Sequence, residues 1–137
     1  MTSLAIVDAG PLYAVADEDD EDHISARAAL ERGDLRVVIP ALVIAEATYF
    51  VGRRLGAAAE ARFIAGLGEM DVEAPTTEDF ARMAELVAQY SEFPLGGTDA
   101  SIVALAERLD TDVVVTLDRR HFGAVTPRHC QAFTILP

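Results

Sequence analysis

The sequence predicts an α/β fold: a three-layer α/β/α sandwich around a mostly parallel five-stranded sheet, in a single domain over residues 1–137. Val113–Leu117 is a near-continuous apolar run rich in β-branched residues, which is typical of a strand buried on both faces. Leu4–Val7 is a second apolar run, and helical patterns separate the two. Strands that alternate with helices indicate parallel pairing through right-handed crossovers, so helices are expected on both faces of the sheet.

The remaining elements follow from apolar periodicity and from residues that stop or start them. Pro11 suits the first turn of a helix, and Pro40 ends a strand. Thr76 or Thr77 can cap one helix and Thr98 the next. The predicted strands are Leu4–Val7, Leu35–Ile39, Met70–Ala74, Val113–Leu117 and Ala132–Leu136. The predicted helices are Pro11–Ala16, Asp22–Arg32, Ala41–Arg54, Ala57–Leu67, Glu78–Glu92 and one that begins at Thr98. The residues of Glu78–Glu92 expected in the core are Phe80, Met83, Ala84, Val87 and Tyr90.

Acidic residues follow two of the predicted strands and begin one helix. Asp8 follows the first strand, Asp118 follows Val113–Leu117, and Asp99 lies in the first turn of the helix between them. The carboxyl ends of parallel strands meet at one edge of an open sheet, where ligands bind. Several acids without an evident general base indicate a hard divalent cation, Mg²⁺ or Mn²⁺. Such a cation can activate water and stabilise the charge of a phosphodiester during hydrolysis.

The helix Ala41–Arg54 is apolar nearly all round, so it is expected to be buried. Glu46 is its single acid, and a buried lone carboxylate is costly unless it is paired, hydrogen-bonded or near a metal. The alternative is that Glu46 lies on a narrow exposed stripe or pairs with Arg53 or Arg54. Because the chain also contains three acids placed for a metal site, we favour a role for Glu46 in that site.

Other chemistries lack their motifs. The sequence contains no Walker loop, no GxGxxG after the first strand, and no HExxH, CxxC or GxSxG. An aspartyl-phosphate mechanism at Asp8, as in haloacid-dehalogenase phosphatases or receiver domains, needs a lysine, and all 11 cations are arginine. A metal-dependent acid cluster is the chemistry that remains.

The formal net charge of −12 argues against nucleic-acid binding, since phosphate contacts need cations. Part of the acidity is the run Asp17–Asp22, which is expected in a solvated loop or at a helix start. The arginines, however, cluster in two places that can hold an RNA backbone: Arg53 and Arg54, and Arg119 and Arg120. No apolar stretch is long enough for a membrane span, so a cytoplasmic protein with no membrane contact is expected.

Four segments in order resemble the successive motifs of the PIN domain, and their spacing is especially similar to that of VapC-type toxins of bacterial toxin–antitoxin pairs. They are Ile6–Gly10 (IVDAG), Pro40–Gly56 (PALVIAEATYFVGRRLG), Gly97–Leu109 (GTDASIVALAERL) and Val113–Phe122 (VVVTLDRRHF). On these motifs Asp8, Glu46, Asp99 and Asp118 match the acidic quartet of the family, and Thr116 matches a polar residue often found before the last acid.

The resemblance implies a Mg²⁺- or Mn²⁺-dependent endoribonuclease that acts on structured RNA, either a tRNA or the large ribosomal RNA. It also implies a homodimer and a cognate antitoxin whose basic C-terminal tail covers the site. Asp8 and Asp99 are the first metal ligands we expect, and Asp118 and Glu46 complete the cluster directly or through waters. Two residues depart from the pattern: Ala9 stands where the family usually has Thr or Ser, and His121 where an acid is frequent.

Two alternatives stay open at this point. One is a PIN-like nuclease that acts on DNA or in RNA processing outside a toxin system. The other is a catalytically silent domain of the same fold that acts through its acidic surface. The presence of all four acids disfavours the silent domain.

Overall fold

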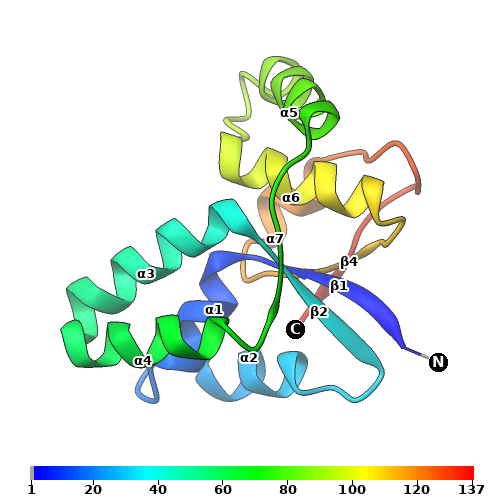
Figure 1. Ribbon diagram of the computed structural model, residues 1–137. Helices are drawn as coiled ribbons and strands as arrows, with labels where there is room; N and C mark the ends of the chain where they lie inside the picture. Colours follow the sequence, from blue (N-terminus) through cyan, green and yellow to red (C-terminus); the bar gives the residue numbers. More distant parts are fainter. Residues whose placement is uncertain (1) are drawn as a thin grey trace.

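Five strands form one sheet in the computed structural model, which describes residues 2–137 (Figure 1). Their order is β3-β2-β1-β4-β5, and all four pairings among them are parallel. The strands are β1 (Ser3–Val7), β2 (Leu35–Pro40), β3 (Asp71–Glu73), β4 (Val113–Val115) and β5 (Thr134–Leu136). The predicted α/β sandwich with a five-stranded, mostly parallel sheet is therefore confirmed.

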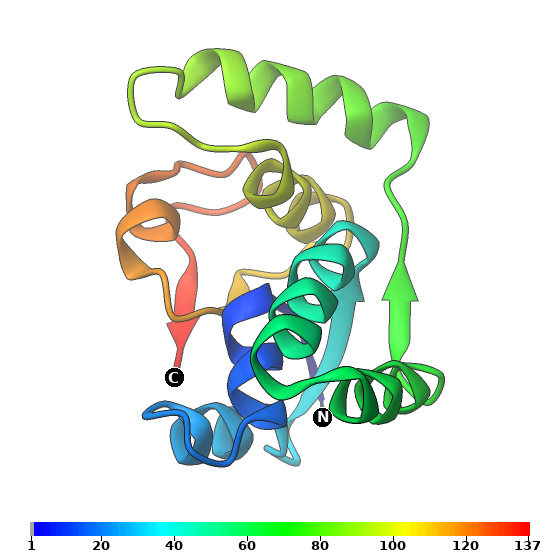
Figure 2. The same ribbon diagram turned by 90° about the vertical axis from the view of Figure 1, so that its left-hand side faces the viewer.

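Helices connect the strands in sequence order. The helices are α1 (Ala9–Ala16), α2 (His23–Leu30), α3 (Ala41–Leu55), α4 (Ala57–Leu67), α5 (Thr77–Gln89), α6 (Gly97–Arg108) and α7 (Arg119–Ala124). The chain steps outward from β1 to β3 and then returns to β4, so right-handed crossovers place α1 to α4 on one face of the sheet and α6 on the other. Figure 2 shows α5 lying across α6, away from the strands.

Helices α6 and α3, which carry site acids, differ in how much of their surface is buried. Helix α6 is buried along Ala100–Ala106 because the sheet lies on one side of it and α5 on the other. Helix α3 buries only one stripe, with Val43, Ala47 and Val51 at every fourth position. Glu46 and Tyr49 are exposed. The expectation that Ala41–Arg54 is buried all round is therefore wrong, because α1, α4 and the sheet contact only part of its circumference.

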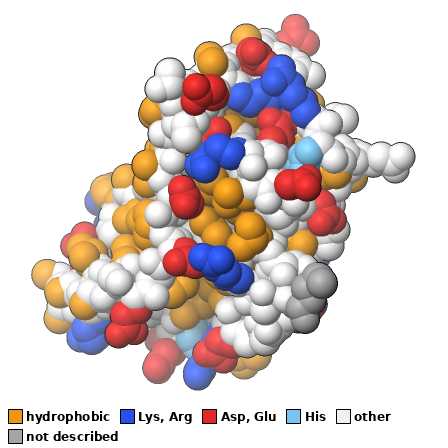
Figure 3. Space-filling model, turned by 45° about the vertical axis from the view of Figure 1, so that its right-hand side comes forward, with side chains coloured by type: hydrophobic (Ala, Val, Ile, Leu, Met, Phe, Trp, Pro, Cys, Tyr) orange, Lys and Arg blue, Asp and Glu red, His pale blue; other side chains and the backbone are white. Residues whose placement is uncertain are grey.

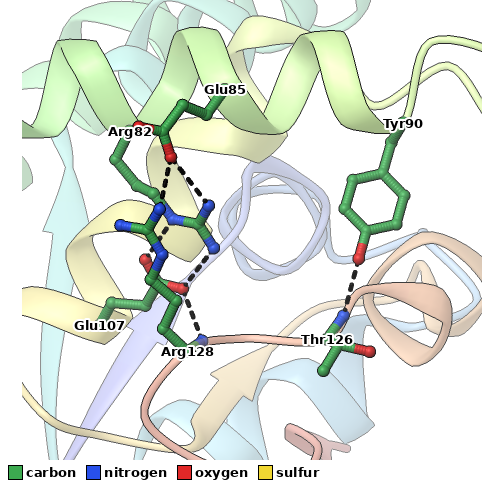
Figure 4. A network of polar contacts seen from close by, with 6 residues as sticks. All are labelled: Arg82, Glu85, Tyr90, Glu107, Thr126 and Arg128. Atoms are coloured by element: carbon green, nitrogen blue, oxygen red, sulfur yellow. Dashed lines mark hydrogen bonds and ion pairs between the residues drawn. The ribbon is translucent and has the colours of Figure 1, made fainter.

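Helix α5 packs mainly against α6, and ion pairs hold it there. Arg82 of α5 donates to both carboxylate oxygens of Glu107 in α6, and Arg128 joins the same cluster from the loop after α7 (Figure 4). Because one face of α5 meets solvent, Phe80 is 54% exposed and Val87 40% exposed. Ala84 is exposed as well, so the prediction that these three residues lie in the core is wrong, whereas Met83 is buried as expected.

The element boundaries also differ in places. Gly96, not Thr98, is the N-cap of α6, and the strand predicted over Val113–Leu117 ends at Val115. Thr76 caps α5 in a reciprocal capping box with Asp79, as one of the two predicted alternatives. Helix α7 was not predicted. No helix within residues 2–137 has both the length and the hydropathy to cross a bilayer.

One face of the sheet keeps apolar side chains at the surface. In Figure 3 hydrophobic side chains gather in the middle of this face, with charged side chains around them. Val72, on the edge strand β3, is 42% exposed, and Leu4 on β1 is only half-buried. The acids described next lie instead at the carboxyl edge of β1 and β4.

Candidate active site

Asp8 and Asp118 lie at the same edge of the sheet, as the sequence predicts. Asp8 directly follows β1 and is the N-cap of α1, where its Oδ1 accepts a hydrogen bond from Ala9 N at 2.7 Å. Asp118 is the N-cap of α7, shortly after β4. Strands β1 and β4 are parallel neighbours, and Asp8 N donates to Val115 O at 2.9 Å. The two carboxylates are thus set by the ends of adjacent strands.

Thr116 connects these two acids. Its hydroxyl donates to Asp8 Oδ2 at 2.8 Å and accepts from the backbone N–H of Asp118 at 3.0 Å. The residue is only 1% exposed, so both interactions are shielded from water. Thr116 therefore fixes one oxygen of Asp8 and the backbone that carries Asp118.

His121 is part of the same site. Asp118 accepts from His121 N at 3.0 Å through Oδ1, and its Oδ2 lies 2.6 Å from His121 Nδ1. Asp99, Asp118 and His121 each offer one possible ligand atom, and these three atoms lie within 4.8 Å of one another. They are close enough to surround one cation. The sequence left the role of His121 open. Its position three residues after a capping acid is the signal that could have placed it here, because N-cap and N3 side chains approach each other.

Asp99 has the most strongly shifted pKa of the four acids. It lies in the first turn of α6. Burial and the charge of Asp8 raise the pKa of Asp99 to about 6, with further increases from Asp118 and Glu46 and an opposing effect of His121. Asp99 therefore interacts with each of the other three acids.

Asp8 and Glu46 respond to the same crowding. Burial raises the pKa of Asp8, hydrogen bonds from Thr116 and Ala9 oppose the rise, and the charge of Asp118 adds to it. Burial of the Glu46 carboxyl and then the charge of Asp8 raise the pKa of Glu46, although much of this residue is exposed. Within residues 2–137 Glu46 forms no ion pair with an arginine. It lies on an exposed stripe of α3, and the effect of Asp8 on its pKa shows that it also faces the acid cluster.

The donor set suits a hard divalent cation. Carboxylates from four separate elements meet at one sheet edge, and burial together with the charges of neighbouring acids raises the pKa values of Asp8, Glu46 and Asp99. A bound cation would relieve that repulsion, and oxygen donors are those that Mg²⁺ and Mn²⁺ prefer. The residues present therefore fit the expected metal.

Within residues 2–137 some arginines form ion pairs and others lie over aromatic rings. Ion pairs in the described chain use six of the 11 arginines: Arg27, Arg32, Arg36, Arg82, Arg108 and Arg128. Arg53, Arg54, Arg119 and Arg120, the predicted RNA contacts, form none within residues 2–137. The guanidinium of Arg54 lies over the rings of Tyr13 and Phe50, at 5.0 and 4.8 Å from their centroids. Arg120 lies 5.6 Å from the ring centroid of Phe93.

Comparison with known proteins identifies the fold family. Residues 5–126 match the family model of the PIN domain. The chain belongs to the PIN domain family. This PIN domain is 33% identical over 135 residues to Ribonuclease VapC26 of Mycobacterium tuberculosis, and the alignment covers 96% of this chain and 99% of the relative.

Solved structures of similar fold include VapC20 of Mycobacterium tuberculosis, a sarcin–ricin loop cleaving toxin. Its TM-score is 0.80 at 20% identity, over 93% of this chain and 98% of that chain. A toxin–antitoxin complex from Klebsiella pneumoniae matches with a TM-score of 0.67 at 18% identity, over 88% of this chain and 92% of that chain. The resemblance of this PIN domain to VapC-type ribonuclease toxins is therefore confirmed.

Proposed function

We propose that this PIN domain is a divalent-metal-dependent endoribonuclease that acts in the cytoplasm as the toxin of a toxin–antitoxin pair. The observation that carries the proposal is the convergence of Asp8, Glu46, Asp99 and Asp118 from four elements onto one edge, with the pKa of Asp99 raised to about 6. Carboxylates crowded in this way repel one another, which is typical of a site that holds a cation. The 33% identity to a VapC ribonuclease supports RNA as the substrate.

In this proposal each side chain has a defined role. Asp8 and Asp99 are metal ligands, and Asp118 and Glu46 complete the cluster directly or through waters. Thr116 orients Asp8 through its hydroxyl. When bound, Mg²⁺ or Mn²⁺ supplies the positive charge that offsets the carboxylates and promotes attack of water on the phosphodiester.

The substrate we propose is a structured RNA, either a tRNA or the large ribosomal RNA. The guanidinium groups of Arg53, Arg54, Arg119 and Arg120, which form no ion pair with an acidic side chain within residues 2–137, hold its backbone phosphates. The structurally similar VapC20 is a sarcin–ricin loop cleaving toxin. A hairpin of that ribosomal loop is therefore the first defined substrate to try.

We also propose a homodimer and a cognate antitoxin with a basic C-terminal tail that covers the acids. Solved complexes of similar toxins with antitoxins support the second partner. Exposed apolar side chains on two adjacent helices, Tyr49 on α3 and Ile64 on α4, support a protein contact of this chain with itself. Light scattering of the purified chain would measure the mass of the particle.

The test is cleavage of total cellular RNA by antitoxin-free protein in Mg²⁺, Mn²⁺ or EDTA, with sequencing of the new RNA ends. We expect discrete fragments that require the metal and disappear in Asp99→Asn. The matched control is Asp19→Asn, which removes an exposed carboxylate in the loop after α1 and should cleave as wild type does. If no RNA is cut under any metal and the protein binds no metal in calorimetry, the acidic interaction domain replaces this proposal.

A further inference from the structure

Phe93 lies against two side chains that adjoin the acid cluster. It belongs to the loop between α5 and α6. Its ring centroid is 4.9 Å from that of His121, with the two planes tilted by 45°. The guanidinium of Arg120 lies 5.6 Å from the same ring. Because His121 also contacts Asp118, an aromatic ring and a cation border the proposed site of cleavage.

The loop that carries Phe93 is held at its start. The backbone N–H of Phe93 donates to Tyr90 O at 3.1 Å. The hydroxyl of Tyr90 accepts from Thr126 N at 3.0 Å, which connects the end of α5 to the chain after α7 (Figure 4). Phe93 is only partly exposed and Arg120 is exposed. Phe93 therefore lies on a loop that is held at its start, and Arg120 lies on α7, whose N-cap is Asp118.

The charge of the chain limits what phosphate contacts alone can contribute. The formal net charge is −12, and of the four arginines proposed to contact RNA only Arg119 and Arg120 directly follow an acid of the cluster, Asp118. Affinity that rests on phosphate neutralisation grows with the number of cations that replace counterions. An acidic ribonuclease with so few free cations needs contacts that do not depend on charge. Stacking of bases on aromatic rings and on arginine planes is the contact that RNA offers.

We propose that Phe93 and Arg120 form a binding site for one unpaired nucleobase of the RNA, beside the phosphodiester that is cut. The base stacks on Arg120, whose guanidinium lies over the Phe93 ring and is held in place by it, and Arg120 also contacts a neighbouring phosphate. The base must be unpaired because a base inside a duplex has both faces covered by its neighbours. This inference rests on the proposed ribonuclease function and names the part of the substrate that the site recognises.

The test is fluorescence anisotropy with a fluorescein-labelled single-stranded RNA of mixed sequence and with the duplex that it forms with its complement. The protein is Asp99→Asn in Mg²⁺, so that the RNA stays intact. We expect Phe93→Leu in this background to bind the single strand at least about fivefold more weakly, because stacking is lost. Phe93→Trp should keep the affinity. Arg120→Ala should weaken binding and make it less dependent on salt.

A matched control is Phe80→Leu, the same change at an exposed phenylalanine of α5. It should bind the single strand as the Asp99→Asn parent does, and all variants should show the parent's thermal midpoint. The proposal is overturned if Phe93→Leu binds like the parent, if the duplex binds as tightly as the single strand, or if the parent binds neither RNA.

The two proposals can fail separately. If the wild-type chain cleaves RNA but Phe93→Leu leaves single-strand affinity unchanged, the ribonuclease stands and the base-binding site is wrong. If Phe93→Leu weakens binding but the wild-type chain cuts no RNA in any metal, the base-binding site stands and the ribonuclease is wrong.

Discussion

Burial, and after it the charge of Asp8, makes Asp99 a weaker acid than an ordinary aspartate by raising its pKa. Its pKa is raised to about 6 in the folded chain, against about 3.9 for an aspartate in an unfolded chain. Between these values the folded protein holds the proton more tightly than the unfolded protein does. The stability contributed by protonated Asp99 is therefore fully present at low pH and is lost as the pH rises through about 6.

Replacement of Asp99 by Asn is expected to stabilise the metal-free protein at neutral pH while it abolishes cleavage. The gain should be on the order of 1 kcal/mol, since Asp99 is partly exposed and solvent screens its charge. It should shrink as the pH falls from about 7 to about 5, where wild-type Asp99 takes up its proton. Urea unfolding at several pH values measures this difference. A clear loss of metal-free stability in the variant would mean that Asp99 acts as a structural cap of α6.

Thr116 offers a second test at the level of single atoms. In Thr116→Val the shape of the side chain is kept, but Asp8 Oδ2 and Asp118 N lose their hydroxyl partner. We expect a loss of about 1–2 kcal/mol in stability and a roughly 10- to 100-fold weaker affinity for Mn²⁺ in calorimetry. The control is Thr48→Val on α3, whose hydroxyl donates to carbonyls of its own helix. Equal metal affinity in both variants would contradict the role given to Thr116.

At the scale of elements, two ion pairs attach α5 to α6, Arg82 with Glu107 and Asp79 with Arg108, and the first is the more deeply buried at its arginine. The side chains of Arg82 and Glu107 are 12% and 11% exposed, and their closest N–O distance is 2.8 Å. Burial acts to raise the pKa of Glu107, but the hydrogen bonds from Arg82 and from Arg128 N outweigh it and lower the pKa. Glu107 therefore contributes stability that is lost as the pH falls through the carboxylate range.

Removal of Arg82 should be far more destabilising than removal of a surface arginine. In Arg82→Met the Glu107 carboxylate stays buried with fewer partners, so we expect a loss of about 3 kcal/mol at pH 7 and a smaller loss in acid. Arg27→Met breaks an ion pair whose side chains are 60% and 63% exposed, and it should lose less than about 0.5 kcal/mol. Chemical denaturation of both variants provides the comparison. Similar losses would show that the network contributes little to holding α5.

Most elements could be predicted because their patterns are local. The residue range predicted for α4 agrees with the structure, and β2 differs from its prediction by one residue. Burial of whole helices could not be predicted, since it depends on partners distant in sequence. Helix α6 is buried because α5 covers it, and α3 is half-exposed because nothing covers Glu46 and Tyr49. Helix α7 was missed because its six residues are too few for a periodic pattern.

Part of the site could be predicted because the parallel topology of the whole sheet determines where the strand ends lie. Parallel strands β1 and β4 bring their carboxyl ends together, so acids that follow those strands must meet. Strand ends alone could not place Glu46 in the same cluster. Its position as the single acid of a largely apolar helix favoured that role, and the resemblance to the PIN domain matched it to the family's acidic quartet. The contact between Phe93 and His121 joins the loop after α5 to helix α7, which is distant in sequence, and no local pattern indicates it.

The overall charge leads to an expectation for the salt dependence of RNA binding. The four arginines proposed to contact RNA can neutralise at most four phosphates, so the logarithm of the association constant should fall with the logarithm of salt concentration with a slope no steeper than about −3 for a single strand. Anisotropy titrations of Asp99→Asn between low and physiological salt measure this slope. A much steeper slope would place the RNA on other arginines, with their ion pairs broken.

The central proposal is that four acids from separate elements form one metal centre. Calorimetric titration of Mn²⁺ into antitoxin-free protein tests it most directly, with Asp99→Asn and the loop variant Asp19→Asn measured beside the wild type. The account predicts saturable binding to the wild type and to Asp19→Asn and its loss in Asp99→Asn. Equal binding to all three proteins, or no binding to the wild type, would contradict it.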